Sequence, residues 1–165
     1  MLKQTLILLI FAATLVAQDG ITVIDEQSES PMLLGRHSRI DFMDSSFVGW
    51  FNEEFDSYKI DEECLSPLNE KINDVKTTII MGTWCGDSKR EVPHFYKIAD
   101  FLGYDEKNID LICVDRAKVG VADEVDGLDI ELVPTFIFYK DGEEIGRIIE
   151  TPIETLEVDL ANILK

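Results

Sequence analysis

One cysteine of this chain stands where a short β-branched run changes into an amphipathic segment. Residues 77–80 are apolar or β-branched, the motif Trp84-Cys85-Gly86-Asp87-Ser88 follows, and apolar residues then recur at helical spacing up to Leu102. We therefore expect Cys85 at the start of a helix, where unpaired N–H groups and the helix dipole favour a negative charge. A cysteine in such a place often has a lowered pKa and acts as a nucleophile, so the sequence predicts a reactive thiol.

Charged and polar residues follow Cys85 within one helical turn. Lys89 and Arg90 add positive charge, whereas Asp87 opposes it. Ser88 lies one turn after the cysteine, where a hydroxyl could hydrogen-bond a thiolate.

The motif resembles the active site of the thioredoxin family, Trp-Cys-Gly-Pro-Cys-Lys. Two further features are in register with that family. Pro93 lies where the family's active-site helix is kinked, and Val133-Pro134-Thr135 heads an apolar run where the family carries a cis-proline facing the active cysteine. The resemblance covers roughly residues 72–165. It implies an α/β, thioredoxin-like fold, in which a central mixed sheet is flanked by helices, here with an N-terminal helical extension.

The resemblance also implies roles for individual residues. The residues expected to be catalytic are Trp84, Cys85, Ser88 and Pro134. The residues expected to form a substrate groove are Gly86, Asp87, Val133 and Thr135.

Three positions depart from the family pattern. Ser88 replaces the second cysteine of the C-x-x-C pair, and a hydroxyl cannot complete a disulfide. The family's buried aspartate falls on Ile79, and its lysine companion falls on Leu111. These residues assist proton transfer in dithiol reduction, so their absence favours a monothiol C-x-x-S site over an ordinary thioredoxin cycle.

Three function classes are compatible with this pattern. In the first, a monothiol oxidoreductase or isomerase, Cys85 attacks a disulfide and a second protein or low-molecular-weight thiol resolves the mixed disulfide. The second is a redox-inactive binding module for extended peptides. The third resembles monothiol glutaredoxins, whose Cys-Gly-x-Ser sequence can hold an iron–sulfur cluster with glutathione, but Trp84 and an export signal argue against it. We therefore expect no cofactor and no metal ligands.

The amino-acid composition indicates which classes of molecule the protein can be expected to bind. The 165 residues include 45% hydrophobic residues, enough for a folded core, and 33 acidic against 15 basic residues give a net charge of −18. Such a surface repels nucleic acid and anionic lipid, so neither is an expected partner. The oligomeric state is not indicated by any sequence feature.

Residues 1–17 have the pattern of a secretory signal. Lys3 supplies a positive start, residues 6–16 are apolar, and Ala17 is a plausible cleavage position. This predicts an exported, bacterial-type protein that is periplasmic or secreted and has no membrane insertion after cleavage. An uncleaved N-terminal anchor is the alternative.

The expected elements follow from hydrophobic spacing. In the extension, residues 18–71, we expect a polar tail with a weak strand signal at 21–24, a loop at 31–39, and helices over 47–55 and 62–73. In the domain, residues 72–165, we expect strands at 75–81 and 109–115, helices at 88–102 and from Thr151-Pro152 onward, a short helix and loop at 117–131, and a hairpin around Asp141-Gly142.

Several residues outside the motif have simple interpretations. Cys113 lies in a buried-strand pattern and is expected to be inert, whereas Cys64 has no clear role. We expect His37 to be exposed or hydrogen-bonded and His94 to be exposed on its helix. The aromatic residues of the extension are expected to add to the core, with a platform near Trp84 as the alternative.

Overall fold

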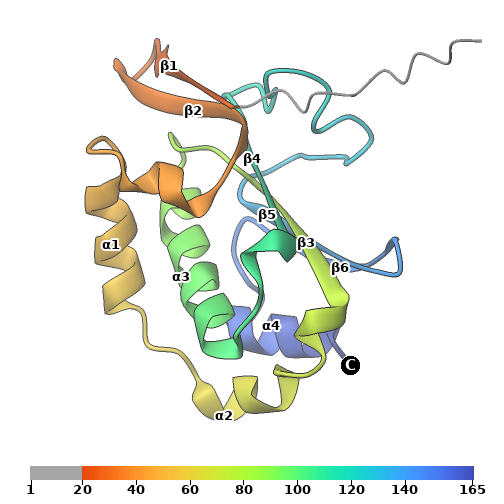
Figure 1. The fold of residues 1–165 in the computed structure, drawn as a ribbon. Coiled ribbons are helices and arrows are strands. Elements are labelled where there is room, and N and C mark those ends of the chain that lie inside the picture. Colours follow the sequence, from red (N-terminus) through yellow and green to blue (C-terminus); the bar gives the residue numbers. More distant parts are fainter. Residues whose placement is uncertain (1–19) are drawn as a thin grey trace, which may run out of the picture.

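A computed structural model describes residues 20–165, and the predicted signal at residues 1–17 lies outside them. Its centre is a six-stranded sheet with the order β1-β2-β4-β3-β5-β6 (Figure 1). The strands are β1 (Ile21–Asp25), β2 (Ser30–His37), β3 (Val75–Met81), β4 (Ile109–Cys113), β5 (Thr135–Lys140) and β6 (Glu143–Ile149). Only β3 and β4 pair in parallel among these neighbours, so the sheet is mixed.

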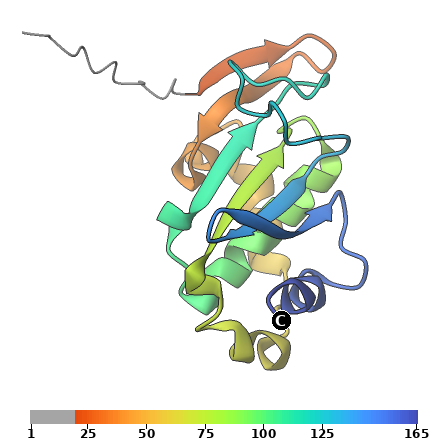
Figure 2. The same cartoon turned by 90° about the vertical axis from the view of Figure 1, so that its right-hand side faces the viewer.

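Helices cover one face of this sheet (Figures 1 and 2). They are α1 (Val48–Ser57), α3 (Gly86–Leu102) and α4 (Leu156–Ile163), while the four-residue α2 (Glu62–Leu65) packs against α4. The predicted apolar face of α3 is buried on the sheet; its residues are Val92, Phe95, Ala99 and Leu102. The α/β, thioredoxin-like class with a mixed sheet and flanking helices is therefore confirmed.

The other face is partly covered by the chain between β4 and β5. Apolar residues of this loop, among them Val125 and Leu128, pack against a second buried cluster that includes Ile80 and Ile137. Within residues 20–165 no helix forms here, so the short helix predicted at 117–131 is wrong. The carboxylate of Asp115 accepts hydrogen bonds from two backbone N–H groups of the loop, which competes with a helical arrangement.

The N-terminal extension contains strands as well as helices. Residues 31–39, predicted as a loop, form most of β2, which pairs antiparallel with both β1 and β4. Their backbone hydrogen bonds are made with residues far along the chain, such as the pairing of Gly35 with Cys113, and local patterns carry no signal for this. The predicted helix at 47–55 is present as α1. Its aromatic residues add to the core as predicted: Phe47 and Phe51 are buried, and Trp50 and Phe55 pack half-buried against the same cluster.

Two helix predictions need correction. The helix expected at 62–73 is broken into α2 and two 3₁₀ turns, Ser66–Leu68 and Ile72–Asp74. The last helix begins at Leu156 rather than at Thr151-Pro152, and Ile153 is 94% exposed. Asp159 accepts hydrogen bonds from the N–H groups of Ile153 and Glu154, which holds these residues in a turn before the helix.

His94 is buried, contrary to the prediction of an exposed helix residue. Its ring stacks on Tyr58 at a centroid distance of 3.9 Å, and its Nε2 lies 3.1 Å from a carboxylate oxygen of Glu54. The N-terminal extension therefore covers this side of α3.

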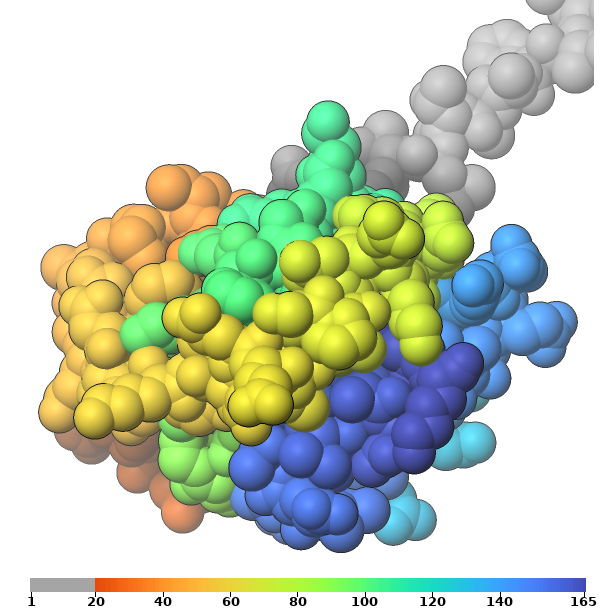
Figure 3. All heavy atoms as spheres, turned by 90° about the horizontal axis from the view of Figure 1, so that it is seen from below, coloured from red at the N-terminus to blue at the C-terminus, as the bar shows by residue number. Residues whose placement is uncertain are grey.

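Seen from the α2 end, the N-terminal segment around α2 lies beside the C-terminal helix (Figure 3). Among residues 20–165, none of the helices has both the length and the apolar character needed to cross a bilayer.

Candidate functional site

Cys85 is the N-cap residue of α3. Its backbone is extended, with φ −89° and ψ 129°, and its carbonyl accepts the first helical hydrogen bond, from Lys89 N–H at 3.0 Å. The strand β3 ends at Met81, and the loop turns back through a hydrogen bond from Cys85 N–H to the carbonyl of Gly82. The half-buried thiol thus lies where the free N–H groups of a 17-residue helix begin.

The loop before β5 lies against this cysteine. The Sγ–H of Cys85 donates to the carbonyl oxygen of Val133 at 3.2 Å, although the two residues are 48 positions apart. The Val133–Pro134 peptide bond is cis. Thr135 begins β5, and its hydroxyl donates to the carbonyl of Leu132 at 2.8 Å. The tertiary structure therefore brings together the two separated motifs of the sequence.

Ser88 is fully buried beneath the cysteine loop. Its Oγ accepts a hydrogen bond from Gly82 N–H at 3.3 Å, so the hydroxyl ties the first turn of α3 to the end of β3. The sequence suggested that the Ser88 hydroxyl could hydrogen-bond the Cys85 thiolate. The hydrogen bonds of the described residues do not include this contact. Asp87 pairs with Arg90 at 2.7 Å, and Gly86 is exposed at the helix start.

Trp84 is held by the segment that follows β4. Its Nε1 donates to the carbonyl of Val114 at 2.9 Å, and the guanidinium of Arg116 lies 4.9 Å from its ring centroid. Gly82 permits this packing, since a Cβ there would lie 2.5 Å from the indole ring.

Arg116 is in turn held by Asp25, at the end of β1. The guanidinium donates to both carboxylate oxygens at 2.8–3.2 Å, and Ser28 donates to one of them at 2.6 Å. These hydrogen bonds, with that of Arg116 first, hold the pKa of Asp25 well below its usual range. The hairpin β1–β2 is thereby fastened beside the cysteine loop. A second link, from Leu33 N–H to the buried hydroxyl of Thr83, has a length of 3.2 Å.

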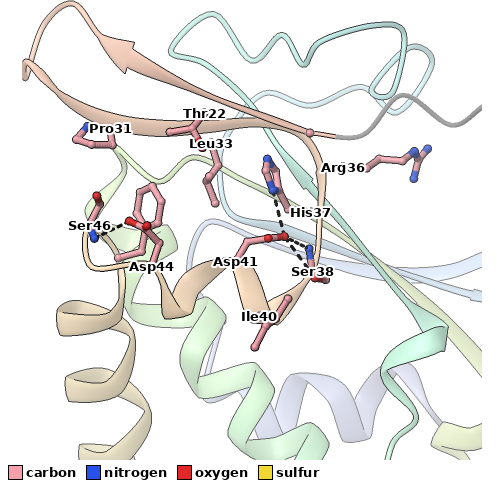
Figure 4. A pocket seen from close by; sticks show the side chains of 12 residues that line it. Thr22, Pro31, Leu33, Arg36, His37, Ser38, Ile40, Asp41, Asp44 and Ser46 are labelled. Atoms are coloured by element: carbon pink, nitrogen blue, oxygen red, sulfur yellow. Dashed lines mark hydrogen bonds and ion pairs between the residues drawn. The ribbon is translucent and has the colours of Figure 1, made fainter.

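A large cavity lies elsewhere, beneath the β1–β2 hairpin, and has a volume of about 920 Å³ (Figure 4). His37 borders it, but both ring nitrogens are engaged, Nδ1 with Asp41 at 3.2 Å and Nε2 with the carbonyl of Leu34 at 3.1 Å. Residues 20–165 contain no group of three or more histidine, cysteine or acidic residues arranged to hold a metal ion. His37 is therefore engaged on both sides, and Cys85 is the stronger candidate for the chemistry of the molecule.

Comparison with known proteins agrees with this geometry. A family model described as Thioredoxin matches residues 66–162, more than half of the chain. The chain belongs to the thioredoxin family. It is 33% identical over 94 residues to thioredoxin AMT13 of Alternaria alternata, covering 54% of this chain and 74% of that protein. It is 36% identical over 67 residues to a thioredoxin of Malassezia sympodialis, covering 41% of this chain and 60% of that protein.

Solved structures similar to this chain include other thioredoxins. That of Fasciola hepatica is 20% identical, with a TM-score of 0.39, over 60% of this chain and 86% of the other. Mitochondrial thioredoxin 3 of Saccharomyces cerevisiae is 29% identical, with a TM-score of 0.35, over 52% and 76% of the two chains. Members of the thioredoxin family act on protein thiols or disulfides, and membership supports a thiol–disulfide redox function in general.

Ile79 and Leu111 are the two positions where an apolar residue replaces an ionisable residue of the thioredoxin pattern. They are neighbours in space. Ile79 pairs directly with Leu111 in the parallel β3–β4 ladder, and both side chains are buried. The place that a carboxyl and an ammonium group take in the family pattern is therefore filled by aliphatic carbon. No proton carrier lies at these two positions.

The structure adds site residues that sequence reasoning missed. Arg116, Asp25 and Thr83 all surround Trp84 or its loop, and none of them belongs to the thioredoxin motifs. Arg116 and Asp25 are 91 positions apart, so no sequence signal links them. Arg90, expected to add positive charge beside Cys85, is instead bonded to Asp87 and Glu91.

Proposed function

We propose that this protein is a monothiol thiol–disulfide exchange protein whose nucleophile is Cys85. The Cys85 thiolate attacks one sulfur of a substrate disulfide, forms a mixed disulfide and releases the other sulfur as a thiolate. An external thiol then attacks the mixed disulfide, which returns Cys85 to its reduced state. The substrates are protein or low-molecular-weight disulfides, and the first role we assign is an oxidoreductase or isomerase.

One observation carries this proposal: the site presents a single sulfur. Cys85 lies at the helix start against the loop of Pro134, while the neighbouring position is occupied by the buried hydroxyl of Ser88. A serine cannot attack a mixed disulfide to form a new disulfide. Release therefore depends on a thiol from outside the C-x-x-S motif.

The other two cysteines are poorly placed as resolving thiols. Cys113 is fully buried in β4, and burial raises its pKa far above the usual range of a thiol. Cys64 lies on α2, at the opposite end of α3 from the cysteine loop (Figure 1). Burial also raises the pKa of Cys64, with Asp61 adding to the effect.

The surrounding residues have roles that follow from their contacts. Val133 and the cis-peptide loop of Pro134 form one wall beside Cys85. In this proposal Trp84, the preceding residue, forms the other. In this proposal Gly86, Asp87 and Thr135 complete a groove in which an extended substrate segment binds. Export to a periplasmic or extracellular space, from the signal pattern of residues 1–17, belongs to the same proposal.

The decisive experiment traps the mixed disulfide. Reduced protein is mixed with a model protein disulfide in the absence of other thiols, and disulfide-bonded adducts are identified by mass spectrometry. We expect one stable adduct at Cys85 that is released when a small thiol is added. Cys85→Ser should form no adduct, and Cys64→Ser should behave like the wild type.

The variant Ser88→Cys tests the monothiol assignment directly. A second cysteine one turn away attacks the mixed disulfide intramolecularly, so its lifetime should fall and reductase activity should appear. The gain should be partial because Ile79 and Leu111 supply no proton carrier. Equal reductase activity in the wild type and in Ser88→Cys would refute the monothiol mechanism.

A redox-inactive peptide-binding module is the second candidate, favoured by the aliphatic Ile79–Leu111 pair. It predicts that extended peptides bind beside Trp84 with no adduct at Cys85. Binding of the same peptides to wild type and Cys85→Ser with equal affinity, together with no trapped adduct, would support this candidate over exchange.

A further inference from the structure

A small pocket lies beside Trp84, on the side where the N-terminal extension meets the core. Its volume is about 290 Å³. The walls come from the β1–β2 turn, the start of α1, the cysteine loop and the first turn of α3; the residues are Asp25, Ser28, Ser30, Pro31, Ser46, Phe47, Trp50, Thr83, Trp84 and Lys89. This size is near the lower end of ligand pockets, roughly 300–1,000 Å³, and fits a side chain better than a cofactor.

The pocket borders the loop and the helical turn that carry Cys85. Trp84 lines it and immediately precedes Cys85, and Lys89 lines it from the helical turn whose first hydrogen bond is to the Cys85 carbonyl. A substrate segment bound at Cys85 therefore has neighbouring residues within reach of this pocket.

Lys89 gives the pocket its charge. Among the cations near Cys85, Arg90 is paired with Asp87 and Glu91, and Arg116 is paired with Asp25. Lys89 is in none of the salt bridges of the described residues, and its Nζ lies 6.0 Å from the ring centroid of Trp50. Asp25 also lines the pocket, but its carboxylate is engaged by Arg116.

Aromatic rings and hydroxyl groups make up most of the remaining walls. Trp50, Phe47 and Trp84 present ring surface, against which the methylene groups of a longer side chain can pack. An ammonium group, hydroxyl groups and aromatic rings together suit a side chain with an aliphatic stem and a terminal carboxylate.

We infer that this pocket binds an acidic side chain of a peptide substrate, close in sequence to the cysteine that Cys85 attacks. The inference rests on the proposed exchange function and gives its substrate a chemical preference. The N-terminal extension would then act in substrate selection, since it supplies Trp50, Phe47 and the serine-rich wall of the pocket.

The test compares matched peptides. Each peptide carries one cysteine as a mixed disulfide with thionitrobenzoate, and either glutamate or glutamine at one position near that cysteine. The released chromophore gives the rate constant of attack by Cys85 at physiological salt. The proteins are wild type, Lys89→Met, Lys89→Arg and, as a matched control, Lys107→Met, whose lysine is 90% exposed on another part of the surface.

We expect the glutamate-to-glutamine rate ratio, at the best position, to fall about two- to fivefold in Lys89→Met, the range of a partly exposed ion pair. Lys89→Arg and Lys107→Met should keep the wild-type ratio. Trp50→Ala should also lower the ratio, because the stem of the glutamate loses its aromatic wall.

The two proposals fail in different ways. No reaction of Cys85 with any peptide would refute the exchange function. Reaction with all peptides, but with a ratio that Lys89→Met leaves unchanged, would refute the acidic-peptide pocket alone. Lys89→Met could also slow the reaction of Cys85 with glutathione disulfide while leaving the rate with every peptide unchanged. That result would overturn the assignment of the pocket to a peptide.

Discussion

The thioredoxin-like core and the N-terminal extension differ in where their ionisable side chains lie. In the core, the family's ionisable pair is replaced by the aliphatic contact between Ile79 and Leu111. The extension, in contrast, meets the core through buried or half-buried polar groups. Besides its buried aromatic residues and the β2–β4 pairing, these polar contacts are Asp25 with Arg116, Tyr58 and the Asp61 N–H with Glu157, and Glu54 with His94.

This difference separates two physical roles. Apolar burial stabilises the sheet and α3 but is non-directional, whereas hydrogen bonds between charged groups require one arrangement of the two parts. Together with the backbone pairing of β2 with β4, the polar contacts restrict how the extension sits on the core, and with it the position of the walls around Trp84. The site depends on both: the core supplies the sulfur, and the extension supplies the surroundings.

The largest effect should come from restoring the family's carboxyl group in the core. Ile79→Asp buries an unpaired carboxylate beside Leu111 and should lower the free energy of unfolding by about 3–5 kcal/mol at neutral pH. An apolar environment raises the pKa of such a carboxyl, so the loss should shrink as the pH falls below that pKa. Denaturant unfolding at pH 8 and pH 5 measures both effects, with Ile79→Val as the conservative control.

A loss below about 1 kcal/mol at pH 8 would mean that this position accommodates a charge. The core would then accept a buried charge, as the contacts between the extension and the core do.

A smaller effect is expected where the extension contacts a buried carboxylate. Tyr58 donates its hydroxyl to both oxygens of Glu157, at 3.0 and 2.9 Å, and Glu157 is 2% exposed. Tyr58→Phe should cost about 1.5–3 kcal/mol, the range for hydrogen bonds to charged groups. Tyr139→Phe is the control, since no hydrogen bond of the Tyr139 hydroxyl is present among the described residues. Equal free energies of unfolding for Tyr58→Phe and Tyr139→Phe would mean that the hydrogen bonds from Tyr58 to Glu157 do not stabilise the contact between the extension and the core.

The smallest effect should be seen at the ion pair beside the site, and its sign depends on pH. The pKa of Asp25 is held below its usual range, chiefly by Arg116, so its contribution to stability is present above the usual carboxyl pKa and is lost as the pH falls through the lowered value. Asp25→Asn should therefore be less stable than the wild type near neutrality, and the difference should shrink below about pH 4.

Unfolding midpoints in denaturant across this pH range provide the measurement. Asp56→Asn, at an exposed position of α1, should show no such trend. If the stability difference between wild type and Asp25→Asn grew as the pH fell, this would contradict a lowered pKa of Asp25 in the folded protein.

Much of the core was predictable because its signals are local. The β-branched run of β3, the helical spacing of α3 and the Asp141-Gly142 turn each depend on neighbours within a few residues. The position of Cys85 at a strand-to-helix junction follows from the same signals. The Pro134 motif could be related to Cys85 only through its resemblance to a family pattern.

The amino-acid sequence by itself determined the candidate nucleophile, the serine in place of a second motif cysteine and the order of the core elements. Only the tertiary structure decided that β2 joins the sheet, that His94 is buried against Tyr58, and that Arg116 and Asp25 meet over Trp84. The reason is that hydrophobic periodicity reports which face of an element is buried but not what covers it. Contacts between residues 91 positions apart exist only once the chain has closed on itself, and they carry no local pattern.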